Sequence, residues 1–282
     1  MMKKVYLVMH QQKSNTASII SQVVCALERV GIQAVGEPWL AETMGEEVTN
    51  LTYHQSVVGC DAILSIGGDG TFLRANAMAM ERGLPLLGIN LGTVGFLSEI
   101  EWDQLSAACD CLAKEQYTIE SRMMLQVQMG NACFYALNDV VLNRGGYARL
   151  IGLNVGLEGE RVGPYIGDGL VISTPTGSTG YSLSAGGPIV HPKVECIILT
   201  PICAHSLQHR PVVTAATQQI TISLDATYNH SAQVDVDGQQ ALFLSEGQEL
   251  TITRSPQSAR LIHLKPPEFF STIRIKLAEW SR

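Results

Sequence analysis

Short apolar runs alternate with amphipathic stretches along the first 116 residues, and this alternation constrains the fold more than any other feature. The runs have the length of buried strands, and the stretches between them space their apolar residues as helices do. Such alternation is typical of a parallel sheet with helices on both faces. The runs are Val5–Met9, Ala62–Ile66 and Leu86–Ile89, and the helical stretches cover residues 14–30, 71–82 and 102–114.

The pattern changes after about Tyr117, where strand-length runs follow one another between turns rich in Gly, Pro, Asn and Asp. Only residues 179–185 have room for a helical turn. We therefore predict an α/β nucleotide-binding domain over residues 1–116, a β-rich domain over residues 117–265, and a C-terminal segment, residues 266–282, that packs back on the first domain. The predicted strands are Leu125–Met129, Ala136–Leu142, Leu150–Leu157, Leu170–Ser173, Cys196–Thr200, Ile220–Leu224, Gln233–Val236, Leu250–Thr253 and Leu261–Leu264.

The composition excludes several classes of partner. Of the 282 residues, 46% are hydrophobic and 16% are charged, with a formal net charge of -7, so the chain has no general attraction to nucleic acids or anionic membranes. Its apolar runs are shorter than a signal peptide or membrane span requires. The seven cysteines are scattered without zinc-site spacing, which is typical of reduced thiols. We expect a cytoplasmic protein with no nucleic-acid or membrane partner.

The sharpest local signal is the turn Gly67-Gly68-Asp69-Gly70-Thr71, which lies between a predicted strand and a predicted helix. Its glycines allow successive N–H groups to converge, and the helix start adds positive dipole, so the turn can cradle phosphate oxygens. It is neither a Walker loop nor a dinucleotide fingerprint. Asp69 has two interpretations, a helix cap and a carboxylate that accepts a hydroxyl proton during phosphoryl transfer.

Two further signals lie in the second half of the chain. Asn138 and Asp139 interrupt an apolar strand pattern, either at a bulge or strand end or as groups that bind adenine and ribose. The run GDGLVISTPTGSTGYSLSAGGP, from Gly167 to Pro188, combines small residues that admit a ligand with hydroxyls that can bind it. Within it, Tyr181 could stack on a base or belong to the core, and Asp168 could simply form a turn.

Taken together, in this order and spacing, these motifs resemble the NAD kinase family over most of the chain. The resemblance implies a two-domain enzyme that binds NAD between its domains. The enzyme would transfer the γ-phosphoryl group of ATP, with Mg²⁺ or another divalent cation, to the 2′-hydroxyl of NAD's adenosine ribose. It also implies a homodimer or homotetramer, in which a neighbouring subunit reaches into the site.

The resemblance assigns a role to individual residues. Asp69 matches the proton acceptor, and the glycine-rich turn supplies the phosphate-binding positions Gly67, Gly68, Gly70 and Thr71. A solvated surface role is the alternative for the two arginines among the NAD-binding positions. Those positions are Asp69, Gly70, Arg74, Asn138, Asp139, Arg149, Asp168, Thr179, Gly180, Tyr181, Ser182, Leu183, Ser184 and Gln239.

Three positions depart from the family pattern, and two other functions share part of the signal. Many family members carry Glu where Asp139 stands and Ala where Gly180 stands, and some bacterial members have Arg where Ile166 stands. Lipid kinases of the diacylglycerol or sphingosine type share the Gly-Gly-Asp-Gly turn but lack the Thr-Pro-Thr-Gly-Ser-Thr run. A non-catalytic nucleotide sensor on the same fold is the alternative from another class, and the retained Asp69 argues against it.

Overall fold

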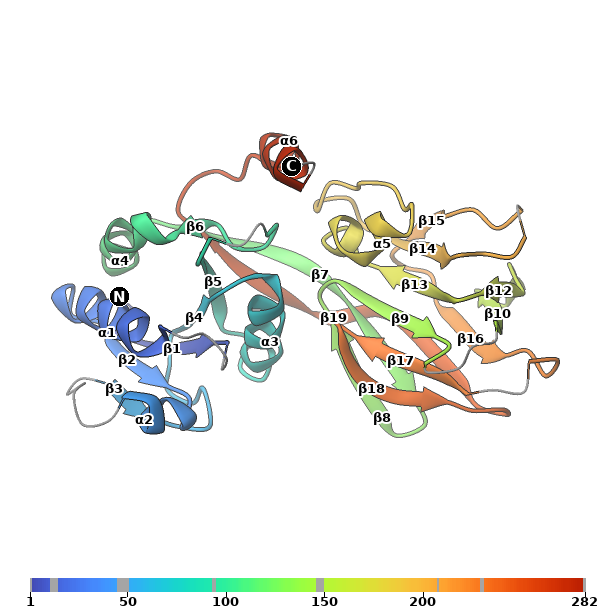
Figure 1. Ribbon diagram of the computed structural model, residues 1–282, viewed down its shortest axis with the longest axis horizontal. Coiled ribbons are helices and arrows are strands. Elements are labelled where there is room, and N and C mark those ends of the chain that lie inside the picture. The colour runs from blue at the N-terminus through green and yellow to red at the C-terminus, as the bar shows by residue number, and fades with distance from the viewer. Residues whose placement is uncertain are drawn as a thin grey trace. The chain divides into compact units, whose positions relative to one another are not determined.

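A computed structural model describes residues 2–10, 15–44, 51–92, 95–145, 150–206, 208–228 and 231–280 (Figure 1). The chain forms two compact units. Unit 1 contains residues 1–121 and 259–282, and unit 2 contains residues 122–258. Two long strands, β7 (Thr118–Met129) and β19 (Glu249–His263), carry the chain from one unit to the other.

Unit 1 is built on a parallel sheet in the order β19-β5-β4-β1-β2-β3, with the short β6 beside β5. The central strands β1, β4 and β5 are buried almost throughout, as expected of parallel strands that are covered on both faces. The strands are β1 (Lys4–Met9), β2 (Gln33–Gly36), β3 (Leu51–Tyr53), β4 (Ala62–Ile66), β5 (Pro85–Asn90) and β6 (Ile100–Glu101).

Helices cover both faces of this sheet, which confirms the predicted architecture (Figure 1). Helices α1 and α4 share one hydrophobic cluster with one face of the strands. Helix α3 lies on the opposite face, where the Phe72 ring approaches so closely that a Cβ at Gly88 would lie 2.8 Å from its Cδ2. The helices are α1 (Thr16–Arg29), α2 (Trp39–Met44), α3 (Asp69–Met80), the 3₁₀ turn η2 (Trp102–Gln104), α4 (Leu105–Ala113) and α6 (Phe269–Trp280). Ser14, in the predicted first helix, lies outside the described residues.

Unit 2 is a pair of antiparallel sheets that enclose a second hydrophobic core. One sheet contains β7, β8 (Ala132–Ala136), β10 (Ile151–Leu157), β11 (Glu160–Arg161), β12 (Tyr165–Gly167), β16 (Ile220–Leu224) and β19. The other has the order β15 (Val212–Ala215), β14 (Cys196–Ile202), β13 (Gly169–Ser173), β9 (Asp139–Asn143), β17 (Ala232–Val236) and β18 (Gln239–Leu244). The 3₁₀ turn η3 (Gly177–Thr179) and the short α5 (Tyr181–Ser184) follow β13.

Three predicted strand runs differ from the structure. The predicted run Ala136–Leu142 is two strands, because the N–H groups of Leu137 and Asn138 donate to the Asp237 carboxylate instead of continuing a strand ladder. The runs Leu250–Thr253 and Leu261–Leu264 were predicted as separate strands, but both belong to β19.

A charged cluster in unit 1 joins β7 and β19 to the loop that follows β5. Nε2 of His263 lies 2.7 Å from a Glu120 oxygen, and its Nδ1 contacts the Glu99 carboxylate. Glu99 also accepts the N–H of Leu264 at 2.9 Å. Burial lowers the pKa of His263, but the hydrogen bonds and charges of Glu120 and Glu99 outweigh it and raise that pKa to about 9.

Replacing His263 with Gln should lower the free energy of unfolding at pH 7 by about 3 kcal/mol, the cost of removing one partner from a buried ion pair. Because the folded-state pKa is above the unfolded value, this stabilisation is complete below about pH 6.5 and is lost as pH rises through about 9. Urea unfolding of both proteins between pH 6 and pH 10 measures the difference.

The matched control is Arg260→Gln, which removes a contact between β19 and the Gly83 carbonyl oxygen. Arginine keeps its charge over this range, so the effect of this variant should not change with pH. A difference between native protein and His263→Gln that is equally independent of pH would contradict a charged His263.

Candidate active site

The glycine-rich turn joins the carboxyl end of β4 to the start of α3 in unit 1. Gly67 has a φ of +155°, and a Cβ there would lie 2.6 Å from the Thr71 hydroxyl, so the turn requires glycine at this position. Gly68 is the N-cap of α3 and has no side chain to cap it. The N–H groups of Thr71 and Phe72 donate to the Gly68 carbonyl oxygen, so the positive dipole and the N–H groups of Asp69 and Gly70 are what this helix start offers a ligand.

Asp69 is the first residue of α3, but its carboxylate binds a different segment of the chain. Its two oxygens accept the main-chain N–H groups of Phe96 at 2.8 Å and Leu97 at 3.0 Å. The structure therefore does not support the helix-cap interpretation. Burial raises the pKa of Asp69, while the two N–H groups and the charge of Lys276 on α6 act in the opposite direction.

Gly95 is the point at which this loop approaches the carboxylate most closely. A Cβ at this position would lie 2.5 Å from Oδ1 of Asp69. A larger residue would have to displace either the carboxylate or the N–H groups that bind it. The loop and the aspartate are therefore fitted to each other, although 26 positions separate Asp69 from Gly95 in the sequence.

Arg74 has a partner inside unit 1. Its guanidinium forms a two-pronged ion pair with the Glu37 carboxylate and donates to the Met9 carbonyl oxygen at 2.6 Å. The solvated surface role was therefore wrong, since the side chain is only 30% exposed. Its charge is balanced by Glu37, so any role in binding NAD would act beside an existing ion pair.

Asn138 and Asp139 lie in unit 2, where the chain passes from β8 into β9. Asp139 is the first residue of β9 and is buried, and its carboxyl group accepts the main-chain N–H of Tyr181 at the start of α5. Burial and the nearby Asp237 raise the pKa of Asp139 to about 7, against the effect of that N–H. The strand-end interpretation is thus confirmed, with a strongly perturbed carboxyl group at the strand end.

Asn138 carries an unused polar atom. Its Oδ1 is buried and has no hydrogen-bond partner within the described chain, an arrangement that costs free energy unless a ligand or water binds it. Gly177 packs directly against its main chain, since a Cβ there would lie 2.1 Å from the Asn138 carbonyl oxygen. A Cβ at Gly180 would lie 3.3 Å from the Gly177 carbonyl oxygen, a tight contact, and 3.6 Å from Nδ2 of Asn138 and Oδ2 of Asp139.

The hydroxyl groups of the Thr-Pro-Thr-Gly-Ser-Thr run mostly build the loop itself. Thr174 donates to the Leu137 carbonyl oxygen at 2.6 Å, and Ser178 donates to that of Pro175 at 2.6 Å. Thr179 and Ser182 are buried and bind Thr176 and Thr200. We had expected these hydroxyls to be available to a ligand. The exposed members of the predicted segment are Tyr181 and Ser184, with Leu183 half-buried.

Tyr181 is 45% exposed, so the core interpretation of this residue was wrong. Its main-chain N–H binds Asp139, which places the aromatic residue beside the carboxyl group at the start of α5. The base-stacking interpretation remains a prediction.

Of the other predicted residues, Asp168 lies at the far end of the same strand pair. Asp168 precedes β13 and lies 3.5 Å from the Arg144 guanidinium. Because Gly169 pairs with Asn143 whereas Ser173 pairs with Asp139, Asp168 is at the opposite end of the strand pair, at least about 13 Å away. Gln239 is exposed at the start of β18, and Arg149 lies outside the described residues.

Sequence reasoning missed Asp237, Phe96 and Leu97. Asp237 accepts the N–H groups of three consecutive residues, and Phe96 and Leu97 supply the N–H groups that bind Asp69. The Asp-Gly pair at 237–238 was a readable turn signal between two strands. No comparable signal marks Phe96 or Leu97, since they act through the main chain.

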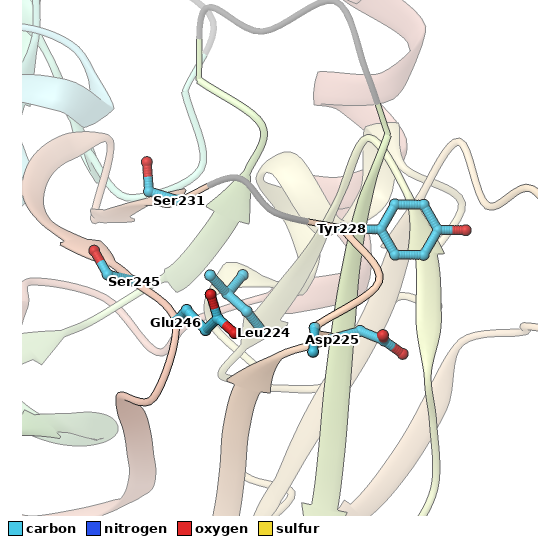
Figure 2. Close-up of a pocket in the computed structure, with 7 residues that line it drawn as sticks. Leu224, Asp225, Tyr228, Ser231, Ser245 and Glu246 are labelled. Atoms are coloured by element: carbon cyan, nitrogen blue, oxygen red, sulfur yellow. The ribbon is translucent and has the colours of Figure 1, made fainter.

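A separate hollow of about 110 Å³ lies in unit 2 at the end of β16 (Figure 2). None of the predicted site residues that the structure describes lines it. Tyr228 projects away from Ser231, Ser245 and Glu246, which lie on the other side of the hollow in Figure 2. Its lining residues are Leu224, Asp225, Ala226, Tyr228, Ser231, Ser245 and Glu246.

Family models for the two parts of one enzyme match the chain in order. The ATP-NAD kinase N-terminal domain matches residues 5–117, and the ATP-NAD kinase C-terminal domain matches residues 137–264. The chain belongs to the NAD kinase family. The resemblance and the two-part fold predicted from the sequence are thereby confirmed, and the lipid-kinase alternative is set aside.

Individual members of the NAD kinase family match nearly the whole chain. The NAD kinase of Ruminiclostridium cellulolyticum is 36% identical over 283 residues, 99% of each chain. That of Moorella thermoacetica is 38% identical over 282 residues, 99% of this chain and 90% of the relative. These lengths show that the likeness includes both units.

Two solved structures of the NAD kinase type resemble this one at 25% identity. Yeast NADH kinase, in complex with NADH, superposes with a TM-score of 0.90 over 98% of this chain and 88% of that one. An NAD kinase from Archaeoglobus fulgidus, in complex with ATP, superposes with a TM-score of 0.77 over 98% of both chains.

Within the described ranges of the present structure, no helix has the length and apolar character of a membrane span.

Two glycines in the segment that follows β13, Gly177 and Gly180, differ in the space around them and allow a matched comparison of stability. Gly177→Ala should lower the free energy of unfolding by about 3 kcal/mol, because its Cβ meets a main-chain carbonyl group that cannot move freely. Gly180→Ala should lower it by about 1 kcal/mol, since its nearest contact, the Gly177 carbonyl oxygen at 3.3 Å, needs a shift of only a few tenths of an ångström. Chemical unfolding of both variants measures the difference, and equal losses would contradict this packing.

Proposed function

We propose that this chain transfers the γ-phosphoryl group of ATP to the 2′-hydroxyl of the adenosine ribose of NAD, with Asp69 as proton acceptor. Membership of the NAD kinase family and the relatives that match the whole chain support the reaction. One observation supports the role of Asp69 in particular. Its carboxylate is half-buried beside a glycine-rich helix start and is held by N–H groups.

The chemistry needs a base that stays in place while charge moves. As the 2′-oxygen bonds to the γ-phosphorus, its proton passes to the Asp69 carboxylate, and the bond from the γ-phosphorus to the ADP oxygen breaks. The N–H groups of Phe96 and Leu97 fix the position of the carboxylate. Burial raises its pKa, which makes the carboxylate a stronger base.

The adenosine half of NAD would bind at the start of β9. The partnerless Oδ1 of Asn138 suits the amino group of adenine, and the Asp139 carboxyl group suits ribose hydroxyls. The exposed Tyr181 ring would stack on the base. Asp168 is too far along the strand pair to contact the same ribose, so we assign it to the more distant half of the dinucleotide.

Mg²⁺ would enter with ATP and be held mainly by its phosphate oxygens and water, as is usual for this ion. Among the described residues, no group of three or more His, Cys, Asp or Glu side chains could hold a metal ion. The described side chains therefore suit an ion that arrives bound to ATP better than an ion whose ligands all come from the protein. A cytoplasmic location and a homodimer or homotetramer are also part of the proposal.

The direct test combines purified protein, MgATP and NAD, and follows NADP with an NADP-specific dehydrogenase. We expect NADP formation that requires all three components. Parallel reactions with NADH, diacylglycerol and sphingosine as acceptors define the substrate class. Phosphorylation of a lipid without any of NAD or NADH would refute the proposal, and binding of NAD without turnover would favour the nucleotide-sensor alternative.

Replacing Asp69 with Asn should lower kcat at least about 100-fold, because the amide cannot accept the proton. The control is Asp61→Asn in the same unit, since Asp61 also accepts two main-chain N–H groups, from Lys3 and Lys4. Both variants should fold, and only Asp69→Asn should lose turnover. Near-native kcat in Asp69→Asn would overturn the assignment of the base.

A variant at Gly70 distinguishes a structural role of the turn from a role in binding phosphate. A Cβ at Gly70 would meet no atom within 4 Å, and alanine favours the helix, so Gly70→Ala should raise the free energy of unfolding by up to about 1 kcal/mol. If phosphate approaches the main chain there, the methyl group should nevertheless raise KM or lower kcat about tenfold. Kinetics and unfolding measured on one preparation test both effects, and unchanged kinetics would place the ligand elsewhere.

A further inference from the structure

We propose that Asp237 is the positioning residue of the adenosine-binding pair: its carboxylate fixes the main chain of Asn138 and Asp139 and controls the charge that Asp139 presents to the ribose. The inference rests on the proposed function of this corner. Asp237 itself would touch neither substrate nor reacting atoms. It acts from the turn between β17 and β18, about 100 positions along the chain.

The geometry of Asp237 is specific. Its φ is +49°, in the left-handed region, and Gly238 follows at +75°, so the turn folds back tightly and directs the carboxylate toward β9. Oδ2 accepts the N–H of Leu137 at 2.8 Å, and Oδ1 accepts those of Asn138 at 2.8 Å and Asp139 at 3.2 Å. The main-chain N–H of Asp237 donates in return to the Asp139 carbonyl oxygen at 3.0 Å.

These bonds hold the point at which the chain leaves one sheet of unit 2 and enters the other. β8 ends at Ala136, β9 begins at Asp139, and the two residues between them belong to neither ladder. Buried N–H groups without a ladder partner need another acceptor, and a single carboxylate supplies it. The orientation of the Asn138 side chain, with its partnerless oxygen, therefore depends on Asp237.

The second effect of Asp237 is electrostatic. Burial and the charge of Asp237 raise the pKa of the Asp139 carboxyl group, and the hydrogen bond from the N–H of Tyr181 lowers it. Burial raises the pKa of Asp237 itself to about 6, against the three N–H groups that it accepts. Two adjacent buried carboxyl groups resist being ionised together. Removing the Asp237 charge should therefore lower the pKa of Asp139 from its native value of about 7.

The test is calorimetric binding of NAD to the full chain at pH 6 and pH 8, in the native protein and in Asp237→Asn. In the native protein, an ionised Asp139 that binds ribose predicts about tenfold weaker binding at pH 6 than at pH 8. Asp237→Asn should bind NAD about tenfold more weakly at pH 8, because the amide cannot accept all three N–H groups. It should also bind with a much smaller ratio between the two pH values.

The backbone should accept this variant, since asparagine adopts the left-handed region more readily than most residues. The matched control is Asp235→Asn on β17, which replaces one of the two oxygens that accept from Asn143 and Gln233 at 2.7 Å each, and neither of these bonds involves residues 137–139. It should lower stability without changing the pH dependence of NAD binding. A second variant, Asp139→Asn, should abolish that pH dependence, because it removes the carboxyl group whose ionisation the binding of ribose needs.

Two outcomes would overturn the inference: Asp237→Asn keeps the native affinity and pH ratio, or Asp235→Asn changes both to the same extent. The proposed function is judged separately, by turnover. Failure of the native protein to form NADP while it binds NAD would refute the kinase proposal. Native turnover combined with unchanged binding in Asp237→Asn would refute only the role of Asp237.

Discussion

Half-buried carboxylates that accept main-chain N–H groups fix the irregular segments of both units. Asp69 binds Phe96 and Leu97 in unit 1, and Asp237 binds residues 137–139 in unit 2. Removing a carboxylate from water is costly, and charge-assisted hydrogen bonds from the peptide groups offset much of that cost. A bond to an N–H group leaves the negative charge in place, whereas a close ion pair such as Arg74 with Glu37 balances it.

A carboxylate held by main-chain N–H groups, with no cation paired to it, suits phosphoryl transfer. A general base must be fixed in position and must still be able to accept a proton. Hydrogen bonds from N–H groups fix the carboxylate and leave it able to accept that proton. The loops that supply these groups are held by close approaches that only glycine permits, at Gly95 beside Asp69 and at Gly177 beside Asn138. The glycine content of the motifs therefore reflects main-chain contact as much as space for a ligand.

Sequence reasoning reached the features that depend on local pattern. The strand Ala62–Ile66, the glycine-rich turn and the family resemblance were all readable, because periodicity and motif order lie within short segments. It failed where distant residues meet through the main chain. The Asp69 contacts cross 27 and 28 positions and those of Asp237 cross 98 to 100, and an accepting carboxylate has no pattern in sequence. The ion pair of Arg74 with Glu37 joins two side chains 37 positions apart, and it was missed because no local pattern links the two residues.

The central claim is that the Asp69 carboxylate accepts the proton of the acceptor hydroxyl. The most direct measurement is the pH dependence of kcat at saturating NAD and MgATP, in the native protein and for the residual turnover of Asp69→Asn. Because burial raises the pKa of Asp69, native kcat should fall at acid pH through an apparent pKa above that of an ordinary aspartate. The account predicts that this acid limb is absent from the variant. The same limb in both proteins would contradict it.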